Sequence, residues 1–205
     1  MTLPDADLLA ARGLSLPPDP LGVNYDPEVY WAVAGDIYEE TFDPEPYREQ
    51  EAVIARALAD LDWTTVLDAG CGFGRIGQLA RGVRPYSTYT GFDVSPAQIA
   101  AMQRRLPGAA GYVNTLAGFG ITATYDLVTS VEVCMHQQAK DIEAIFERLF
   151  SWSHGYVMTC DWYEPGQEHT ANQWNQMHDY PALYGDRLIS QTQVGRQCVF
   201  VGEAG

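Results

Sequence analysis

The chain has 205 residues, 46% of them hydrophobic and 12% aromatic, which is enough for one domain with a buried core and excludes global disorder. Its 27 acidic and 12 basic side chains give a formal net charge of −15, which argues against nucleic acid or an anionic membrane as its general partner. Residues 1–62 hold 14 of the acidic and 3 of the basic side chains, so most of the excess negative charge lies in the N-terminal third.

The first 45 residues are predicted to form an acidic, proline-rich arm that is a candidate lid. Several prolines and the lack of any sustained period predict an extended chain over residues 1–27, and the aromatic and acidic residues 27–42 are compatible with short helices. A helix is expected within residues 46–63, where apolar residues recur at helical spacing. We therefore divide the chain into an arm, residues 1–45, and a domain, residues 46–205.

Strands and helices then alternate along the rest of the chain. The expected order is strand 64–70, helix 75–82, strand 87–94, helix 95–108, strand 111–115, strand 124–133, helix 139–152, strand 155–162, a polar loop 164–180, and an antiparallel pair 187–194 and 196–202. Such alternation predicts a mostly parallel sheet covered by helices on both faces. Ligands of these sheets bind beyond the carboxyl ends of the strands.

Targeting and redox signals are absent from the sequence. No apolar stretch approaches the roughly 18–20 residues of a membrane span, and the acidic start is unlike a secretory signal. The four cysteines, Cys71, Cys134, Cys160 and Cys198, have no metal-ligand spacing and are expected to be small buried residues. We therefore expect a cytoplasmic protein without a membrane partner or a metal; the oligomeric state cannot be read from the sequence.

The most informative motif is VLDAGCGFG at residues 66–74, in which Gly70, Gly72 and Gly74 follow a predicted buried strand and precede a helix. Glycines at this place let the backbone turn sharply and approach a ligand closely. Asp93 ends the next strand, 19 residues after Gly74, where it can accept hydrogen bonds from ribose hydroxyls. A dinucleotide GxGxxG pattern fits only if it starts at Gly72, so a nucleotide-dependent oxidoreductase is the second enzyme hypothesis.

The segments VLDAGCGFG, GFDVSPAQI and YDLVTSVEVCMH together resemble the class I S-adenosylmethionine-dependent methyltransferases. The resemblance covers about residues 46–162 and implies a Rossmann-like, doubly wound, seven-stranded, mostly parallel sheet with an antiparallel last strand. It implies that Asp68 and the loop Gly70, Cys71, Gly72 and Gly74 hold the methionine end of S-adenosyl-L-methionine. It also implies ribose binding by Asp93 and adenine contacts from Val94 and from Asn114, Thr115 and Leu116. Alternatively, Asp68 is a structural acid and Asp93 only assists the following helix.

Methyl transfer from a sulfonium is an in-line displacement, so proximity and alignment contribute most and no strict catalytic signature is expected. His136 follows the fourth strand and is the candidate general base, with a purely structural histidine as the alternative. Glu132 and Asp161, at the ends of the fourth and fifth strands, are the other catalytic candidates.

The residues expected to form the acceptor wall or lid are Tyr30, Trp31, Tyr38, Trp162 and His178. Asp161 with His169, His178 and Asp179 is compatible with a metal site, although a solvated loop explains these residues as well.

The leading functional hypothesis is a methyltransferase acting on a small molecule at a hydroxyl oxygen. Absence of an Asn/Asp-Pro-Pro-Tyr/Phe motif after the fourth strand disfavours methylation of nucleobase amines. N-methylation of other acceptors and protein methylation stay open, as does a non-catalytic partner subunit with the same fold. The acidic N-terminal third favours neutral or cationic acceptors over anionic ones.

Overall fold

The computed structural model describes residues 5–16, 25–167 and 175–205. In chain order its helices are α1 (Ala6–Ala11), α2 (Pro27–Thr41), α3 (Arg48–Asp60), α4 (Arg75–Val83), α5 (Pro96–Arg105), α6 (Ile142–Ser151) and α7 (Tyr180–Tyr184). Three short 3-10 helices cover Glu45–Tyr47, Cys134–His136 and Gly185–Arg187. The strands are β1 (Thr65–Ala69), β2 (Thr88–Asp93), β3 (Ala110–Val113), β4 (Tyr125–Val131), β5 (Ser153–Trp162), β6 (Leu188–Val194) and β7 (Gln197–Glu203).

The strands form one seven-stranded sheet in the order β3-β2-β1-β4-β5-β7-β6. β1 to β5 pair in parallel, whereas β7 is antiparallel to both β5 and β6. This confirms the predicted sheet and its closing antiparallel pair, which turns at Gly195 with φ +57°. From β1 the chain proceeds to β2 and β3 on one side, and from β4 to β5 on the other. The reversal between β1 and β4 is where a sheet of this kind opens a ligand crevice.

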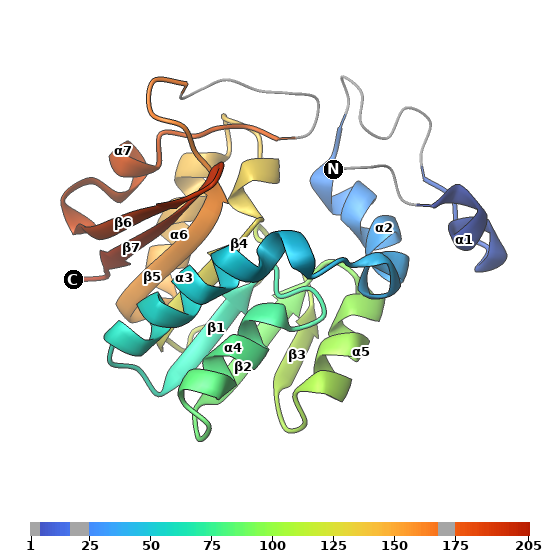
Figure 1. Ribbon diagram of the computed structural model, residues 1–205, viewed down its shortest axis with the longest axis horizontal. Helices are drawn as coiled ribbons and strands as arrows, with labels where there is room; N and C mark the ends of the chain where they lie inside the picture. Colours follow the sequence, from blue (N-terminus) through green and yellow to red (C-terminus); the bar gives the residue numbers. More distant parts are fainter. Residues whose placement is uncertain (1–4, 17–24, 168–174) are drawn as a thin grey trace.

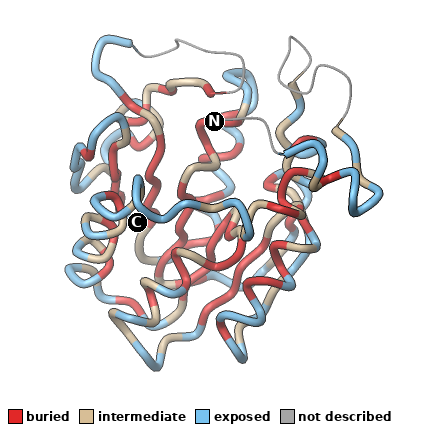
Figure 2. The backbone as a smooth tube through the Cα atoms, turned by 45° about the vertical axis from the view of Figure 1, so that its right-hand side comes forward, coloured by how far each residue is buried: buried red, intermediate tan, exposed pale blue. Residues whose placement is uncertain are grey.

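Two apolar clusters, one on each face of the sheet, hold the helices in place. The cluster with α3, α4 and α5 is built around Ile54, Leu58, Ile76 and Met102. The cluster on the other face joins α6 and α7 to the sheet through aromatic side chains such as Phe146, Tyr184 and Phe200. Figure 1 shows α3, α4 and α5 along the near side of the strands, and Figure 2 shows buried backbone concentrated in the strands between the helical layers.

The N-terminal residues differ from the prediction of an extended arm. Residues 6–11 form α1 because the carboxylate of Asp5 accepts from the amides of Asp7 and Leu8, and Leu9 is buried, with 2% of its surface exposed. Residues 27–41 form one continuous 15-residue helix rather than short pieces, started by Asp26 as N-cap and Pro27 at the first position. Figure 1 shows α1 beside α2 at the edge of the molecule, away from the sheet.

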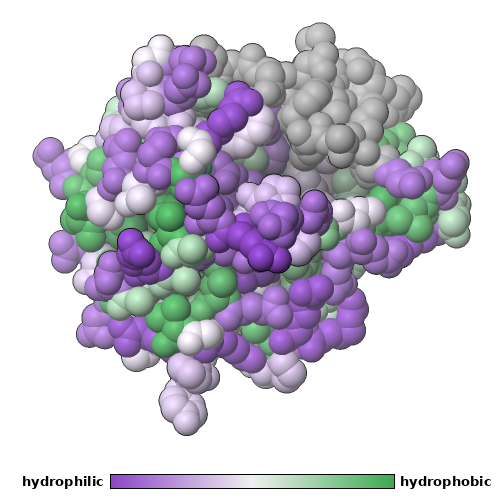
Figure 3. Space-filling view, in the orientation of Figure 1, coloured by the Kyte–Doolittle hydropathy of each residue, from purple (hydrophilic) through white to green (hydrophobic). Residues whose placement is uncertain are grey.

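The face of the molecule seen in Figure 3 is mostly hydrophilic, with small scattered groups of apolar residues. Among the described residues, no helix is both long and apolar enough to cross a membrane.

Candidate functional site

A large cavity of about 890 Å³ lies beyond the carboxyl ends of β1, β2 and β4. Its lining includes the loop after β1, the end of β2, the start of α5 and the segment after β3, through Gly70, Cys71, Gly72, Asp93, Val94, Gln98, Asn114 and Leu116. It also includes α2, the start of α3 and the segment after β4, through Tyr30, Trp31, Tyr38, Tyr47, Gln50, Glu132 and His136. Most of the residues predicted for the cofactor and acceptor therefore share one cavity.

The glycine-rich loop is fixed to the end of β2 by its own amides. The N–H groups of Gly70 and Cys71 both donate to the carbonyl of Phe92, at 2.9 and 3.0 Å. The N–H of Gly72 donates to Oδ2 of Asp93 at 3.0 Å. Gly70 has φ +77°, and a Cβ there would lie 2.4 Å from a methyl group of Val133, so only glycine fits between the turn and the segment that follows β4. Gly74 caps α4 and does not line the cavity.

Asp93 lines the cavity beside the glycine-rich loop. Its Oδ1 accepts from the N–H of Ser95 at 2.9 Å while Oδ2 accepts from Gly72. Burial raises the pKa of the carboxyl, and these backbone hydrogen bonds act in the opposite direction. A carboxylate has about four acceptor positions, so each oxygen retains capacity for a hydroxyl donor from a ribose. The cradle made by Gly70, Gly72 and Asp93 thus fits a nucleoside cofactor.

The three residues predicted to contact adenine occupy different positions. Asn114 and Leu116 line the cavity. The side-chain oxygen of Asn114 accepts from the N–H of Thr115 at 2.9 Å. Thr115 itself lies outside the lining, and its hydroxyl accepts from the N–H of Gly118. The structure therefore leaves Asn114 and Leu116 as the candidates for this contact.

Asp68 lies beneath the loop rather than at the cavity, in contrast to the predicted contact with the cofactor. Its Oδ1 accepts from the hydroxyl of Thr129 at 2.8 Å, and its Oδ2 accepts from the hydroxyl of Tyr89 at 2.5 Å. Burial raises the pKa of Asp68 to about 6. The side chain ties β1 to β2 and β4 and so supports the loop from below, which is the structural alternative that the sequence left open.

His136 lies on the acceptor side, in the 3-10 helix that directly follows β4. It is 5% exposed and lines the cavity. Its ring centroid lies 5.4 Å from that of Trp31 and 6.5 Å from that of Tyr25. Trp31 is in turn 5.5 Å from Tyr38. The predicted lid residues Tyr30, Trp31 and Tyr38 therefore form, on one helix, the wall that faces the candidate base.

Glu132 is part of a partly buried ion-pair network instead of a free base. Its Oε2 accepts from Arg75 Nη2 at 2.9 Å, and its Oε1 accepts from Gln197 at 2.5 Å. Arg75 also donates to Gln50 at 2.7 Å, and its guanidinium lies 4.8 Å from the ring centre of Tyr47. Glu132 has φ +59°, an uncommon conformation for a residue with a side chain. The network joins α3, α4, β7 and the end of β4 along one edge of the cavity.

Asp161 and His178 lie outside the cavity, unlike the catalytic and acceptor-wall positions predicted for them. Asp161 is fully buried away from the lining, where its Oδ1 accepts from the N–H of Met135 at 3.1 Å. His178 is also buried outside the lining, and its Nε2 contacts the carbonyl of Cys134 at 3.0 Å. Trp162 does line the cavity, with the guanidinium of Arg196 over its ring at 4.6 Å.

The metal hypothesis gains no support from the residues that can be described. His169 lies outside them, and in the remainder no group of three or more His, Cys, Asp or Glu side chains is arranged to hold a metal ion.

Arg75, Gln50 and Gln98 are cavity residues that sequence reasoning missed. Arg75 directly follows the glycine-rich loop, and that position at the helix start was a signal that it faces the ligand side. Gln50 interrupts the apolar face of α3, where it is buried. Gln98 follows the Ser95 cap by three residues, which places it on the first turn of α5, close to Asp93 of the cradle.

Comparison with known protein families finds a match for part of the chain. Residues 67–152 match the family model described as a methyltransferase domain. No match is found among curated protein sequences.

Several solved structures share the fold. The magnesium protoporphyrin IX methyltransferase of Synechocystis PCC 6803, solved with bound S-adenosylmethionine, is 17% identical with a TM-score of 0.66, covering 89% of this chain and 99% of that one. An amino pentose methyltransferase from Micromonospora echinaspora is 16% identical with a TM-score of 0.65, covering 82% and 97%. An O-methyltransferase family protein from Burkholderia thailandensis is 14% identical with a TM-score of 0.67, covering 86% and 61%.

Proposed function

We propose that this chain is a class I S-adenosylmethionine-dependent methyltransferase that methylates a small-molecule acceptor at a hydroxyl oxygen. The match of residues 67–152 to a methyltransferase domain and the fold shared with solved methyltransferases support this proposal. The cofactor supplies a methyl group on a sulfonium, which the acceptor oxygen displaces in line. The observation that carries the proposal is that one cavity holds both the Gly70–Asp93 cradle and the buried ring of His136.

The residues of the cavity divide the work between binding and proton removal. Gly70, Gly72 and Asp93 would hold the cofactor, and His136 would take the proton of the acceptor hydroxyl as the new bond forms. Trp31 restricts the histidine ring from the side of α2, with ring centroids 5.4 Å apart. Such restriction supports proton transfer because it limits the orientations that the base samples.

The size and charge of the cavity support a small acceptor without negative charge. Its volume of about 890 Å³ lies near the upper end of the ~300–1,000 Å³ range of ligand pockets, which leaves room for cofactor and acceptor together. Six carboxylates line it, against two guanidiniums, Arg75 and Arg196; the carboxylates are Asp5, Glu28, Asp43, Glu49, Asp93 and Glu132. Arg75 is already paired with Glu132. An anionic acceptor would therefore meet net repulsion.

The test measures transfer of a labelled methyl group from S-adenosylmethionine to a panel of hydroxylated aromatic compounds and their amino counterparts. With an accepted hydroxyl compound, His136→Ala should lower kcat by roughly 100-fold or more and abolish the rise of kcat with pH. The affinity for S-adenosylhomocysteine should stay unchanged, because His136 is not one of the residues that form the cradle. His154→Ala, which removes an exposed histidine on β5, is the matched control.

Wild-type turnover in His136→Ala would refute its role as base. Transfer to the amino compounds alone would refute the assignment to oxygen. Binding of S-adenosylhomocysteine without transfer to any acceptor would favour a non-catalytic partner subunit.

A further inference from the structure

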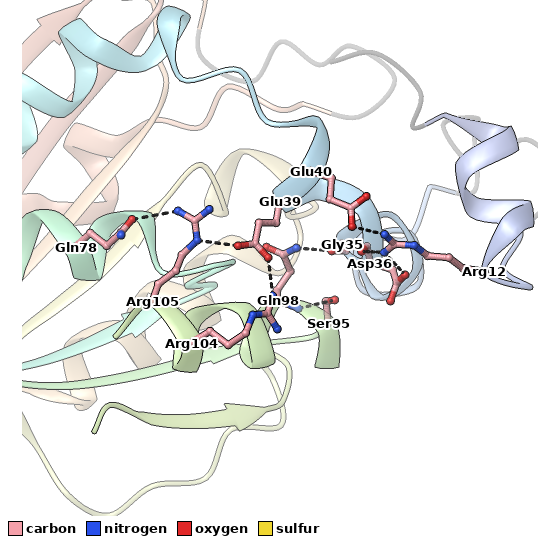
Figure 4. A network of polar contacts seen from close by, with 10 residues as sticks. All are labelled: Arg12, Gly35, Asp36, Glu39, Glu40, Gln78, Ser95, Gln98, Arg104 and Arg105. Atoms are coloured by element: carbon pink, nitrogen blue, oxygen red, sulfur yellow. Dashed lines mark hydrogen bonds and ion pairs between the residues drawn. The ribbon is translucent and has the colours of Figure 1, made fainter. Parts of the chain in front are cut away.

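Gln98 is a buried polar side chain between the cofactor cradle and the acceptor wall. It lies on the first turn of α5, is 3% exposed and lines the cavity. Its Nε2 donates a hydrogen bond to the main-chain carbonyl of Gly35, which lies in the middle of α2 (Figure 4). One side chain therefore joins two helices that are 63 positions apart in the sequence.

The orientation of the Gln98 amide follows from this contact. The carbonyl of Gly35 can only accept, so the NH₂ group must face it and Oε1 must point away. That oxygen is buried and has no hydrogen-bond partner among the described residues. It faces the glycine-rich loop, since a Cβ built on Gly72 would have Oε1 as its nearest neighbour, at 3.5 Å. A buried acceptor without a partner is costly, and here it is directed at the cradle that would hold the cofactor.

The helix that Gln98 holds carries the acceptor wall. Gly35 packs directly on the start of α5, where a Cβ on Gly35 would lie 2.6 Å from the Cβ of Ser95. Trp31 and Tyr38 lie one turn before and one turn after Gly35 on α2, and both line the cavity. The contact of α2 with α5 thus sets where the aromatic rings stand relative to His136.

Outside this close contact, α2 is tied down by ion pairs at the surface. Glu39 pairs with Arg104 and with Arg105 on α5, each at 2.8 Å, as Figure 4 shows. These side chains are partly exposed, and pairs of this kind contribute only about 0–1 kcal/mol each. The buried Gln98–Gly35 contact is therefore the connection between the helices that is positioned to respond to the cofactor.

We infer that Gln98 couples the two halves of the site: its Oε1 accepts a hydrogen bond from an N–H or O–H group of the cofactor, and its Nε2 then holds α2 in the position that forms the acceptor wall. The inference rests on the proposed function, because it takes the cradle to be the cofactor site. Once its oxygen has a partner, the Gln98 side chain is fixed at both ends. Cofactor binding therefore stabilises α2 and precedes productive binding of the acceptor.

The experiment measures hydrogen exchange of the α2 amides with and without S-adenosylhomocysteine, in the full chain. In the wild type, the cofactor product should slow exchange in residues 31–41 by about tenfold or more. Gln98→Met keeps the length of the side chain and removes both polar groups. We expect it to weaken binding of S-adenosylhomocysteine by about 5- to 20-fold in calorimetry, and to abolish the slowing of α2 exchange even at saturation.

Gln103→Met makes the same change on an exposed position of the same helix and should leave both measurements as in the wild type. If saturated Gln98→Met still shows full protection of α2, the coupling role is refuted while the proposed function stands. If Gln98→Met binds S-adenosylhomocysteine as the wild type does, Oε1 is not a ligand of the cofactor and the inference also fails. If the wild-type chain itself does not bind S-adenosylhomocysteine, the proposed function fails instead.

Discussion

Replacing Asp161 by Asn should make the protein more stable above neutral pH and leave the cofactor site intact. Asp161 is fully buried, and burial is the main cause that raises its pKa to about 7. The nearby charge of Glu132 acts in the same direction, whereas the hydrogen bond from the amide of Met135 lowers the pKa. Oδ1 accepts from Met135, but Oδ2 has no hydrogen-bond partner among the described residues. The folded state therefore favours the neutral acid.

The sign and size follow from proton linkage. Between the ordinary pKa of 3.8 and the folded value of about 7, the folded chain binds a proton at Asp161 that the unfolded chain does not. The wild type thus loses stability as pH rises through this window, and the loss is complete above pH 7. At ~1.4 kcal/mol per pH unit, it amounts to about 4 kcal/mol. The amide introduced by Asp161→Asn would keep the acceptor oxygen and carry no charge, so the variant lacks this loss.

Urea unfolding of wild type and Asp161→Asn from pH 4 to 8.5 tests this expectation. The difference in unfolding free energy should be near zero at pH 4 and should favour the variant by about 2–4 kcal/mol at pH 8. Asp186→Asn, at an exposed position, controls for the loss of one negative charge. The difference in unfolding free energy between wild type and variant at each pH removes the contribution of other buried acids such as Asp68, because both chains contain them. A variant that is less stable at pH 8, with no change across the window, would show that Asp161 is ionised in the fold.

Two further predictions concern the glycine-rich loop and Asp93. Asp93→Ala should weaken binding of S-adenosylhomocysteine in calorimetry by about 1–3 kcal/mol, because it removes charge-assisted acceptors and frees the Gly72 amide. Unchanged affinity would mean that Asp93 supports only the loop. Gly70→Ala should destabilise the fold by roughly 1–3 kcal/mol in urea unfolding, since φ is +77° and the new methyl group would meet Val133. A variant as stable as the wild type would contradict the packing of the loop against Val133.

Local sequence signals predicted the sheet well, and the motif residues Gly70, Gly72 and Asp93 line one cavity at its carboxyl edge. Gly70, Gly72 and Asp93 lie within short motifs whose geometry is set by neighbours along the chain, so strand, turn and helix could be read directly. The closing strand pair was equally local, because a two-residue turn with Gly195 separates β6 from β7. In such segments the backbone conformation that a motif requires is also the one that the fold uses.

Roles that depend on distant partners could not be read from the sequence. Asp161 and Asp68 both lie near strand ends at the correct edge, yet both side chains are buried, where groups from other elements bind them: Met135 of a 3-10 helix contacts Asp161, and Thr129 of β4 contacts Asp68. Gln98 looked like an ordinary helix residue, and the pairing of Arg75 was hidden although its place after the glycine-rich loop was a signal, because the partners Gly35, Gln50 and Glu132 come from other elements. Helix α1 was missed for a related reason: six residues do not form a stable helix alone, and Arg12 anchors it to Asp36 and Glu40 of α2.

The close approach of Gly35 to Ser95 also limits how this protein can change over generations. A larger residue at position 35 would collide with the Cβ of Ser95, so it becomes acceptable only after position 95 loses its side chain. Ser95, however, is the N-cap of α5, and its hydroxyl accepts from the amide of Gln98. Loss of that hydroxyl would weaken the helix start beside the cradle before any benefit at position 35 could appear. The two positions are therefore interdependent, and the intermediate step is disadvantageous in either order.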